Sequence, residues 1–122
     1  MSTRKPRLPT ESDEQRKFVQ WFRLQYRVVR IFAIPNGGGR SKAQAGILKA
    51  EGVEAGVPDL CVPAGIDGSG VPTWVEMKRT KDGRISDAQK DWHAYLRGLG
   101  HTVLVCAGFA EARRMVGEIK AR

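Results

Sequence analysis

The sequence predicts an α/β fold in which a mixed sheet is flanked by helices. Two strand-like apolar segments, at residues 56–60 and 74–78, stand on either side of a turn-rich run at 64–72, which predicts a hairpin. A continuous apolar run at 103–106 is typical of a central strand, and the periodic segment 109–119 after it predicts a last helix. With 122 residues, the chain is long enough for one hydrophobic core and one domain.

The first expected element is an amphipathic helix that follows a basic tail. Residues 1–9 contain three cations and two prolines but little that is apolar, so we expect a flexible tail followed by a single domain at 10–122. Thr10 or Ser12 is the candidate N-cap, and the helix is expected to continue to about Tyr26. Its apolar stripe at helical spacing consists of Phe18, Val19, Phe22 and Tyr26.

A strand, a glycine-rich loop and a short helix are expected next. Residues 28–34 are mostly apolar and stop at Pro35, which predicts a buried strand. Glycines in the loop allow the backbone to approach a phosphate closely, and Ser41 begins a helix that Gly52 closes. This stretch is interpreted as a phosphate-binding ledge, with a flexible connector as the alternative. Its candidate DNA contacts are Asn36, Gly37, Arg40, Lys42 and Lys49.

The predicted hairpin carries two acids and a lysine. Side chains alternate along a strand, so Glu76 and Lys78 share one face while Met77 points into the core. Antiparallel pairing about Gly68 sets Asp59 opposite these residues. Carboxylate oxygens suit Mg²⁺ or Mn²⁺, and a neighbouring lysine can orient an attacking water. The hairpin therefore predicts a metal centre, with a solvated, charged strand edge as the alternative.

A basic turn and a third helix follow the hairpin. Arg79 and Lys81 in the turn are further candidate DNA contacts. Ser86-x-x-Gln89 is a capping-box pattern, which predicts the start of a helix that ends at Gly100, with an apolar stripe of Ala88, Trp92, Tyr95, Leu96 and Leu99. Gln89 is suited either to capping this helix or to reaching the metal centre.

Composition limits the classes of function. The chain has 21 Lys and Arg against 13 Asp and Glu, a formal charge of +8, which favours a polyanionic partner. No apolar run approaches the roughly 20 residues that span a bilayer, and no leader pattern appears, so we expect a cytoplasmic protein. Cys61 and Cys106 lack metal or redox spacing and are expected to be buried hydrophobes. His93 and His101 have no suitably spaced partner, which argues against zinc chemistry.

Several motifs together resemble one nuclease family. In order along the chain they are Ile34-Pro35-Asn36-Gly37-Gly38, Gly56-Val57-Pro58-Asp59-Leu60, Glu76-Met77-Lys78 and Ser86-x-x-Gln89-x-x-Trp92. This arrangement resembles the VRR-NUC family of stand-alone phage or bacterial type, within the PD-(D/E)xK superfamily. The resemblance implies a restriction-endonuclease-like αβββαβ core with a helix inserted after the first strand. It also implies a metal-dependent DNA endonuclease, selective for branched DNA such as Holliday junctions, in a bacterial host cell.

The resemblance further implies roles for individual residues. Asp59 and Glu76 would hold Mg²⁺ or Mn²⁺, and the main-chain carbonyl of Met77 would complete the shell. In the family a glutamate on the first helix, with glutamine four residues later, approaches the metal. Glu11 with Gln15 matches this pattern best, Glu14 is the competing assignment, and a contribution from Glu11 would favour two ions over one.

Two further expectations concern assembly and the rival function. A four-way junction is resolved by paired nicks, so one active centre per chain favours a homodimer with two-fold symmetry, and the family resemblance raises this expectation. Trp21, Trp74 and Trp92 are candidate interface residues, with core positions as the alternative. The rival is a non-catalytic basic DNA-binding module, which explains the charge without requiring the acids to meet. A magnesium-dependent cleavage assay separates the two functions.

Overall fold

A computed structural model describes residues 7–35 and 41–122. In this part of the chain the elements are α1 (Glu11–Gln25), β1 (Phe32–Ala33), α2 (Lys42–Ala50), β2 (Leu60–Val62), β3 (Thr73–Lys78), α3 (Asp87–Gly98), β4 (Thr102–Ala107) and α4 (Phe109–Lys120). The predicted order is confirmed, including the helix inserted after the first strand. Most of the predicted tail and the candidates Asn36, Gly37 and Arg40 lie outside the described residues.

The strands form one mixed sheet in the order β1-β2-β3-β4. β2 pairs antiparallel with β1 and β3, whereas β3 and β4 are parallel and are connected through α3. Leu60 pairs with Val75, so Asp59, one residue earlier, comes opposite Glu76. The α/β class and the meeting of the two acids across the hairpin are therefore both confirmed. The bounds predicted for the first hairpin strand, 56–60, are wrong, because β2 begins only at Leu60.

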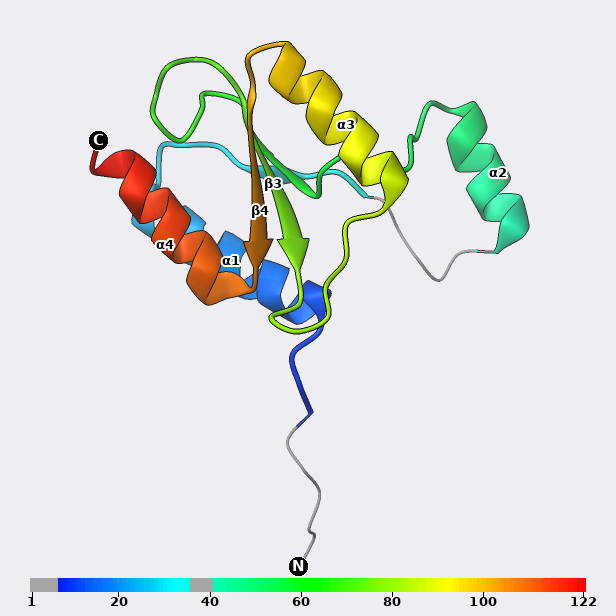
Figure 1. Ribbon diagram of the computed structural model, residues 1–122, viewed down its shortest axis with the longest axis horizontal. Coiled ribbons are helices and arrows are strands. Elements are labelled where there is room, and N and C mark those ends of the chain that lie inside the picture. Colours follow the sequence, from blue (N-terminus) through cyan, green and yellow to red (C-terminus); the bar gives the residue numbers. More distant parts are fainter. Residues whose placement is uncertain (1–6, 36–40) are drawn as a thin grey trace, which may run out of the picture.

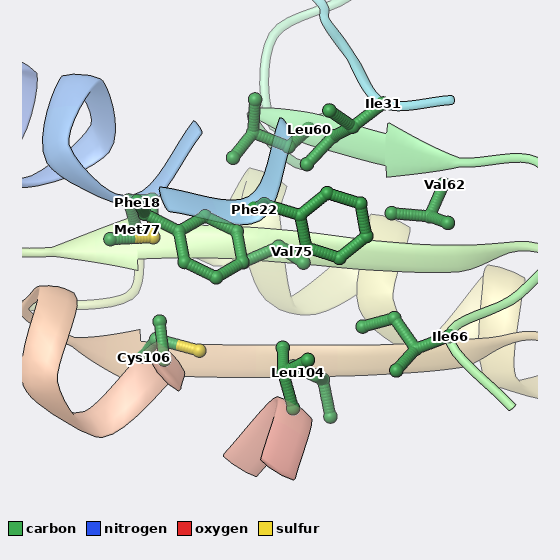
Figure 2. Packing of buried hydrophobic residues seen from close by; sticks show 12 residues of the cluster. Phe18, Phe22, Ile31, Leu60, Val62, Ile66, Val75, Met77, Leu104 and Cys106 are labelled. Carbon is green, nitrogen blue, oxygen red and sulfur yellow. The ribbon is translucent and has the colours of Figure 1, made fainter. Parts of the chain in front are cut away.

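The hydrophobic core lies between the sheet and two helices. Phe18 and Phe22 from α1 pack with Val75 and Met77 of β3 (Figure 2), and residues of α4 complete the cluster. The alternate residues of β3 face α3, which lies on the other side of the sheet from α1 and α4 (Figure 1). Strand alternation thus separates an apolar face of β3 from a face that carries the charged residues.

The first predicted strand is much shorter than expected. The expectation of a buried strand over residues 28–34 is wrong, because only Phe32 and Ala33 pair and both are exposed at the sheet edge. A turn closed by the Val29 amide on the Tyr26 carbonyl occupies the first part of the segment, and Val28 is 94% exposed. Ile31 is buried in the core and Val29 packs against it, so the apolar run reflects a loop beside the core rather than a paired strand.

The predicted central strand is also misplaced. β4 stands at the other edge of the sheet and pairs only with β3 within the described chain, so the expectation of a central strand for 103–106 is wrong. The run is apolar because α3 and α4 pack against β4 and cover both of its faces. Burial of the faces, not position in the sheet order, produces a continuous apolar pattern.

The helices begin at the predicted caps. Thr10, Ser41 and Ser86 each accept a hydrogen bond from the amide three residues later, and the side chain at that later position bonds back to the cap amide. Helix α2 has no buried residue and stands to one side of the sheet (Figure 1). The stripe predicted for α3 is partly wrong, because Tyr95 and Leu99 are exposed and the buried residues are His93 and Leu96.

The cysteines are buried and free, as expected. Burial raises the pKa of the Cys106 thiol to about 12 and also raises that of Cys61, so both are poor nucleophiles. The three tryptophans are half-buried against their own chain; Trp74, for example, stacks on His101 and donates to its Nδ1 at 3.1 Å. Within residues 7–35 and 41–122, no helix is long and apolar enough to cross a membrane.

Candidate active site

Asp59 lies where β2 and β3 begin to separate. Its main-chain carbonyl accepts from the Ile34 amide at 2.8 Å, and its side-chain Oδ2 accepts from the Met77 amide at 2.7 Å. The preceding Pro58 is fully buried, which fixes the approach of the chain to this position. Asp59 is therefore held by both neighbouring strands, with one carboxylate oxygen anchored to β3.

Glu76 is a buried acid beside that carboxylate. It is 1% exposed on β3 and faces α3 rather than the core. Burial, together with the adjacent Asp59, raises the pKa of Glu76 to about 9, and the ammonium of Lys78 only partly opposes this shift. Because Lys78 offsets the negative charge of the two adjacent carboxyl groups only in part, the pair favours either a shared proton or a bound cation.

Lys78 and Gln89 meet at the end of β3. The Nζ of Lys78, which is buried, donates to Oε1 of Gln89 at 2.9 Å. The same oxygen accepts from the Ser86 amide at 2.8 Å, within the capping box of α3. Gln89 therefore caps the helix and also accepts from the lysine, while its predicted part in catalysis stays a prediction.

The two candidate acids on α1 have different surroundings. Glu14 is buried, and its Oε2 accepts from the Phe109 amide at 2.6 Å. That amide opens α4, whose N-cap Gly108 has no side chain to offer, so Glu14 caps α4 from a distant part of the chain. Glu11 is exposed, and its charge is one of the smaller causes that raise the pKa of Glu76. Glu14 is therefore engaged at α4, and Glu11 is the acid on α1 whose charge acts on Glu76.

Sequence reasoning missed His93. Its Nε2 lies 3.2 Å from Oε1 of Glu76, and both side chains are buried. Burial is the main reason that the pKa of His93 is lowered, followed by the nearby charges of Arg97 and Lys78. The helical spacing of four from Gln89 was the available indication, because it places both side chains on the face of α3 that meets β3.

The donor set fits a hard divalent cation. Among the described residues, no group of three or more His, Cys, Asp and Glu side chains is placed to hold a metal. Asp59 and Glu76 supply two carboxylates, and the Met77 carbonyl belongs to the residue that directly follows Glu76. Mg²⁺ is usually bound by one or two carboxylates plus water and substrate phosphate, and this is what the site offers.

Four of the predicted DNA contacts lie in the described part of the chain and all are exposed. Arg79 and Lys81 lie in the turn that follows β3, whereas Lys42 and Lys49 are on α2. In residues 7–35 and 41–122 none of the four forms an ion pair. Two of these cations thus follow the strand that carries Glu76, and two are on the projecting helix.

Comparison with known proteins agrees with this architecture. One solved structure, described as a VRR_NUC domain protein, matches with a TM-score of 0.73 and 21% identity over 93% of this chain and 90% of that chain, which shows a shared fold. No curated protein matches the sequence. The VRR-NUC domain model matches residues 6–110, which include both acids, the lysine and α3. The chain therefore belongs to the VRR-NUC domain family, a family of nucleases.

Proposed function

We propose that the protein is a DNA endonuclease that requires Mg²⁺ or Mn²⁺ and hydrolyses phosphodiester bonds. One observation carries this proposal: Asp59 and Glu76 meet across the hairpin with Lys78 on the same strand face, and the pKa of Glu76 is raised to about 9 by burial and by Asp59. A purely structural sheet has no reason to bury Glu76 beside a second acid when the single cation, Lys78, offsets the two charges only in part. A DNA-binding module likewise has no need of them.

Each residue has a role that its surroundings support. Asp59 and Glu76 would hold the cation with the Met77 carbonyl, and Glu11 would extend the acidic cluster from α1. When bound, the cation supplies Lewis-acid stabilisation of the charge that develops on the phosphate. Lys78, held by Gln89, adds a positive charge next to the scissile phosphate and orients the water that attacks in line with the leaving oxygen.

The DNA-binding surface in this proposal consists of the basic residues around the site. Arg79 and Lys81 would contact phosphates beside the scissile bond, and Lys42 and Lys49 would contact the duplex farther away. The candidates Asn36, Gly37 and Arg40 precede α2 in sequence and remain predictions. Selectivity for branched DNA such as Holliday junctions is part of the proposal and rests on the family resemblance.

We also propose a homodimer, since one chain offers one Asp59–Glu76 pair and a junction needs two nicks. The tryptophans considered for the interface are packed against their own chain, so other residues must supply it. Exposed apolar side chains gather near the β1 edge, where Leu24 and Phe32 line a groove of about 790 Å³ and Val28 is nearby in sequence. A second copy that covers this edge would also protect its unpaired backbone groups.

The test compares flap, splayed-arm, four-way and linear duplex DNA in Mg²⁺ and in chelator. The proposal expects cleavage in Mg²⁺ alone, highest on the four-way junction, with two symmetric nicks and a dimer mass by light scattering. Binding without cleavage on every substrate would favour the DNA-binding module. Single nicks by a monomer would instead indicate a flap-type nuclease.

A further inference from the structure

Among the described residues, His93 is the buried polar residue in contact with the acids to which the proposed function gives no role. It is 3% exposed, and its Nε2 lies 3.2 Å from Oε1 of Glu76. An ionised carboxylate can only accept hydrogen bonds, so whenever Glu76 carries its charge the ring must donate from Nε2. The Nε2 hydrogen is then directed at a single oxygen of the acid.

The helix that carries His93 is fixed at several points, so the ring has little freedom to move. Gln89 joins α3 to Lys78 one turn earlier, and the Arg97 guanidinium donates to the Val103 carbonyl of β4 at 2.9 Å one turn later. Close to the start of the helix, Gly56 lies so near Ala88 that an added Cβ would be 2.5 Å from its main-chain carbon. The imidazole is therefore presented to β3 by a rigid support.

This geometry determines how Glu76 can act. Asp59 has one oxygen engaged by the Met77 amide, and Glu76 has Oε1 engaged by His93, so each acid has one oxygen committed to the protein. The two carboxyls also meet each other, because a side-chain hydrogen bond between Asp59 and Glu76 is among the causes that raise the pKa of Glu76, and a bound cation would take the place of that contact. Groups that hydrogen-bond a metal-ligating side chain orient it and commonly change metal affinity by roughly 10- to 100-fold when they are removed.

We infer that His93 is a positioning residue for Glu76, whose imidazole fixes one carboxylate oxygen so that the other is directed at the divalent cation. The inference rests on the proposed function, because it assigns a purpose to the Glu76 side chain as a ligand. It goes beyond that function by placing a determinant of metal affinity on α3, outside the acid and lysine motifs. Together, Gln89 and His93 allow one helix face to orient both Lys78 and Glu76.

The experiment measures Mn²⁺ binding to the full chain by titration calorimetry, without DNA, and the melting temperature of each metal-free protein. His93→Leu fills the space of the ring but forms no hydrogen bond, and His93→Phe is a second variant of that kind that keeps an aromatic ring. His93→Gln restores a donor on a side chain of similar reach. Leu96→Ala is the control, because Leu96 is buried one turn along α3 and only packs.

His93→Leu and His93→Phe are expected to weaken Mn²⁺ binding by roughly tenfold or more, while His93→Gln recovers much of the affinity. Leu96→Ala is expected to lower the melting temperature and leave Mn²⁺ affinity within about twofold of wild type, since a cavity there does not touch Glu76. Wild-type affinity in a folded His93→Leu or His93→Phe protein overturns the inference and leaves the nuclease proposal intact. A wild-type protein that binds no Mn²⁺ overturns both.

Discussion

Glu76→Gln should change how the stability of the metal-free protein depends on pH. The pKa of Glu76 is raised from an ordinary 4.5 to about 9, so the folded protein favours the protonated acid. This contribution to stability is full below pH 4.5 and is lost as the pH rises towards 9. Linkage gives a slope of about 1.4 kcal/mol per pH unit, and hence a loss of up to about 4 kcal/mol between pH 5 and pH 8.

The assay is urea unfolding of wild type and Glu76→Gln in chelator at pH 5, 6, 7 and 8. The glutamine cannot ionise, so the variant should lose less stability towards pH 8, and the difference between the two curves isolates Glu76. Glu118→Gln is the matched control, because this exposed acid pairs only with Arg114 on the surface and should leave the wild-type slope unchanged. Parallel curves for wild type and Glu76→Gln would refute the burial argument.

Other perturbations separate the structural roles from the functional ones. Glu14→Ala should cost about 1.5 to 3 kcal/mol of stability, since it removes the buried carboxylate that caps α4. Glu11→Gln should leave urea unfolding unchanged and slow cleavage. The reverse pattern would exchange the two assignments. Gly56→Ala should destabilise the protein by roughly 2 to 4 kcal/mol, because the φ of Gly56 is +94° and an added Cβ would clash with Ala88. Gly117→Ala is the control: it has open space around it and should stabilise the protein by up to about 1 kcal/mol in the same unfolding assay. DNA affinity measured by anisotropy should fall steeply with salt, with a slope of about 0.7 to 0.9 per phosphate neutralised, and a salt-insensitive affinity would contradict the phosphate contacts.

Local chemistry made the hairpin and the helix caps predictable. Side-chain alternation along β3 and the turn-rich run before it were enough to bring Asp59 opposite Glu76. The capping-box patterns at Ser86 and Ser41 likewise gave the starts of two helices. In each of these cases the interacting residues are close in sequence, or the prediction depends only on the alternation of side chains along a strand.

Contacts between distant segments were not predictable in the same way. Glu11 and Glu14 are both in the first turn of α1, so local sequence does not distinguish them. The amide that donates a hydrogen bond to Glu14 belongs to Phe109, which is far away in the sequence. The sequence indicates only that His93 has no second metal-ligating residue at a suitable spacing, and it does not predict the contact of His93 with Glu76. The strand predicted at 28–34 failed because an apolar run beside the core resembles a strand whether or not it pairs.

Single-turnover cleavage of a four-way junction tests the central claim most directly. Wild type, Asp59→Asn, Glu76→Gln and Lys78→Ala are compared in Mg²⁺, with DNA binding measured separately in chelator. The account predicts that either acid substitution abolishes cleavage while binding stays near wild type, and that Lys78→Ala slows cleavage by roughly 100-fold or more with Mn²⁺ binding retained. Near-normal cleavage by Asp59→Asn or Glu76→Gln would contradict it.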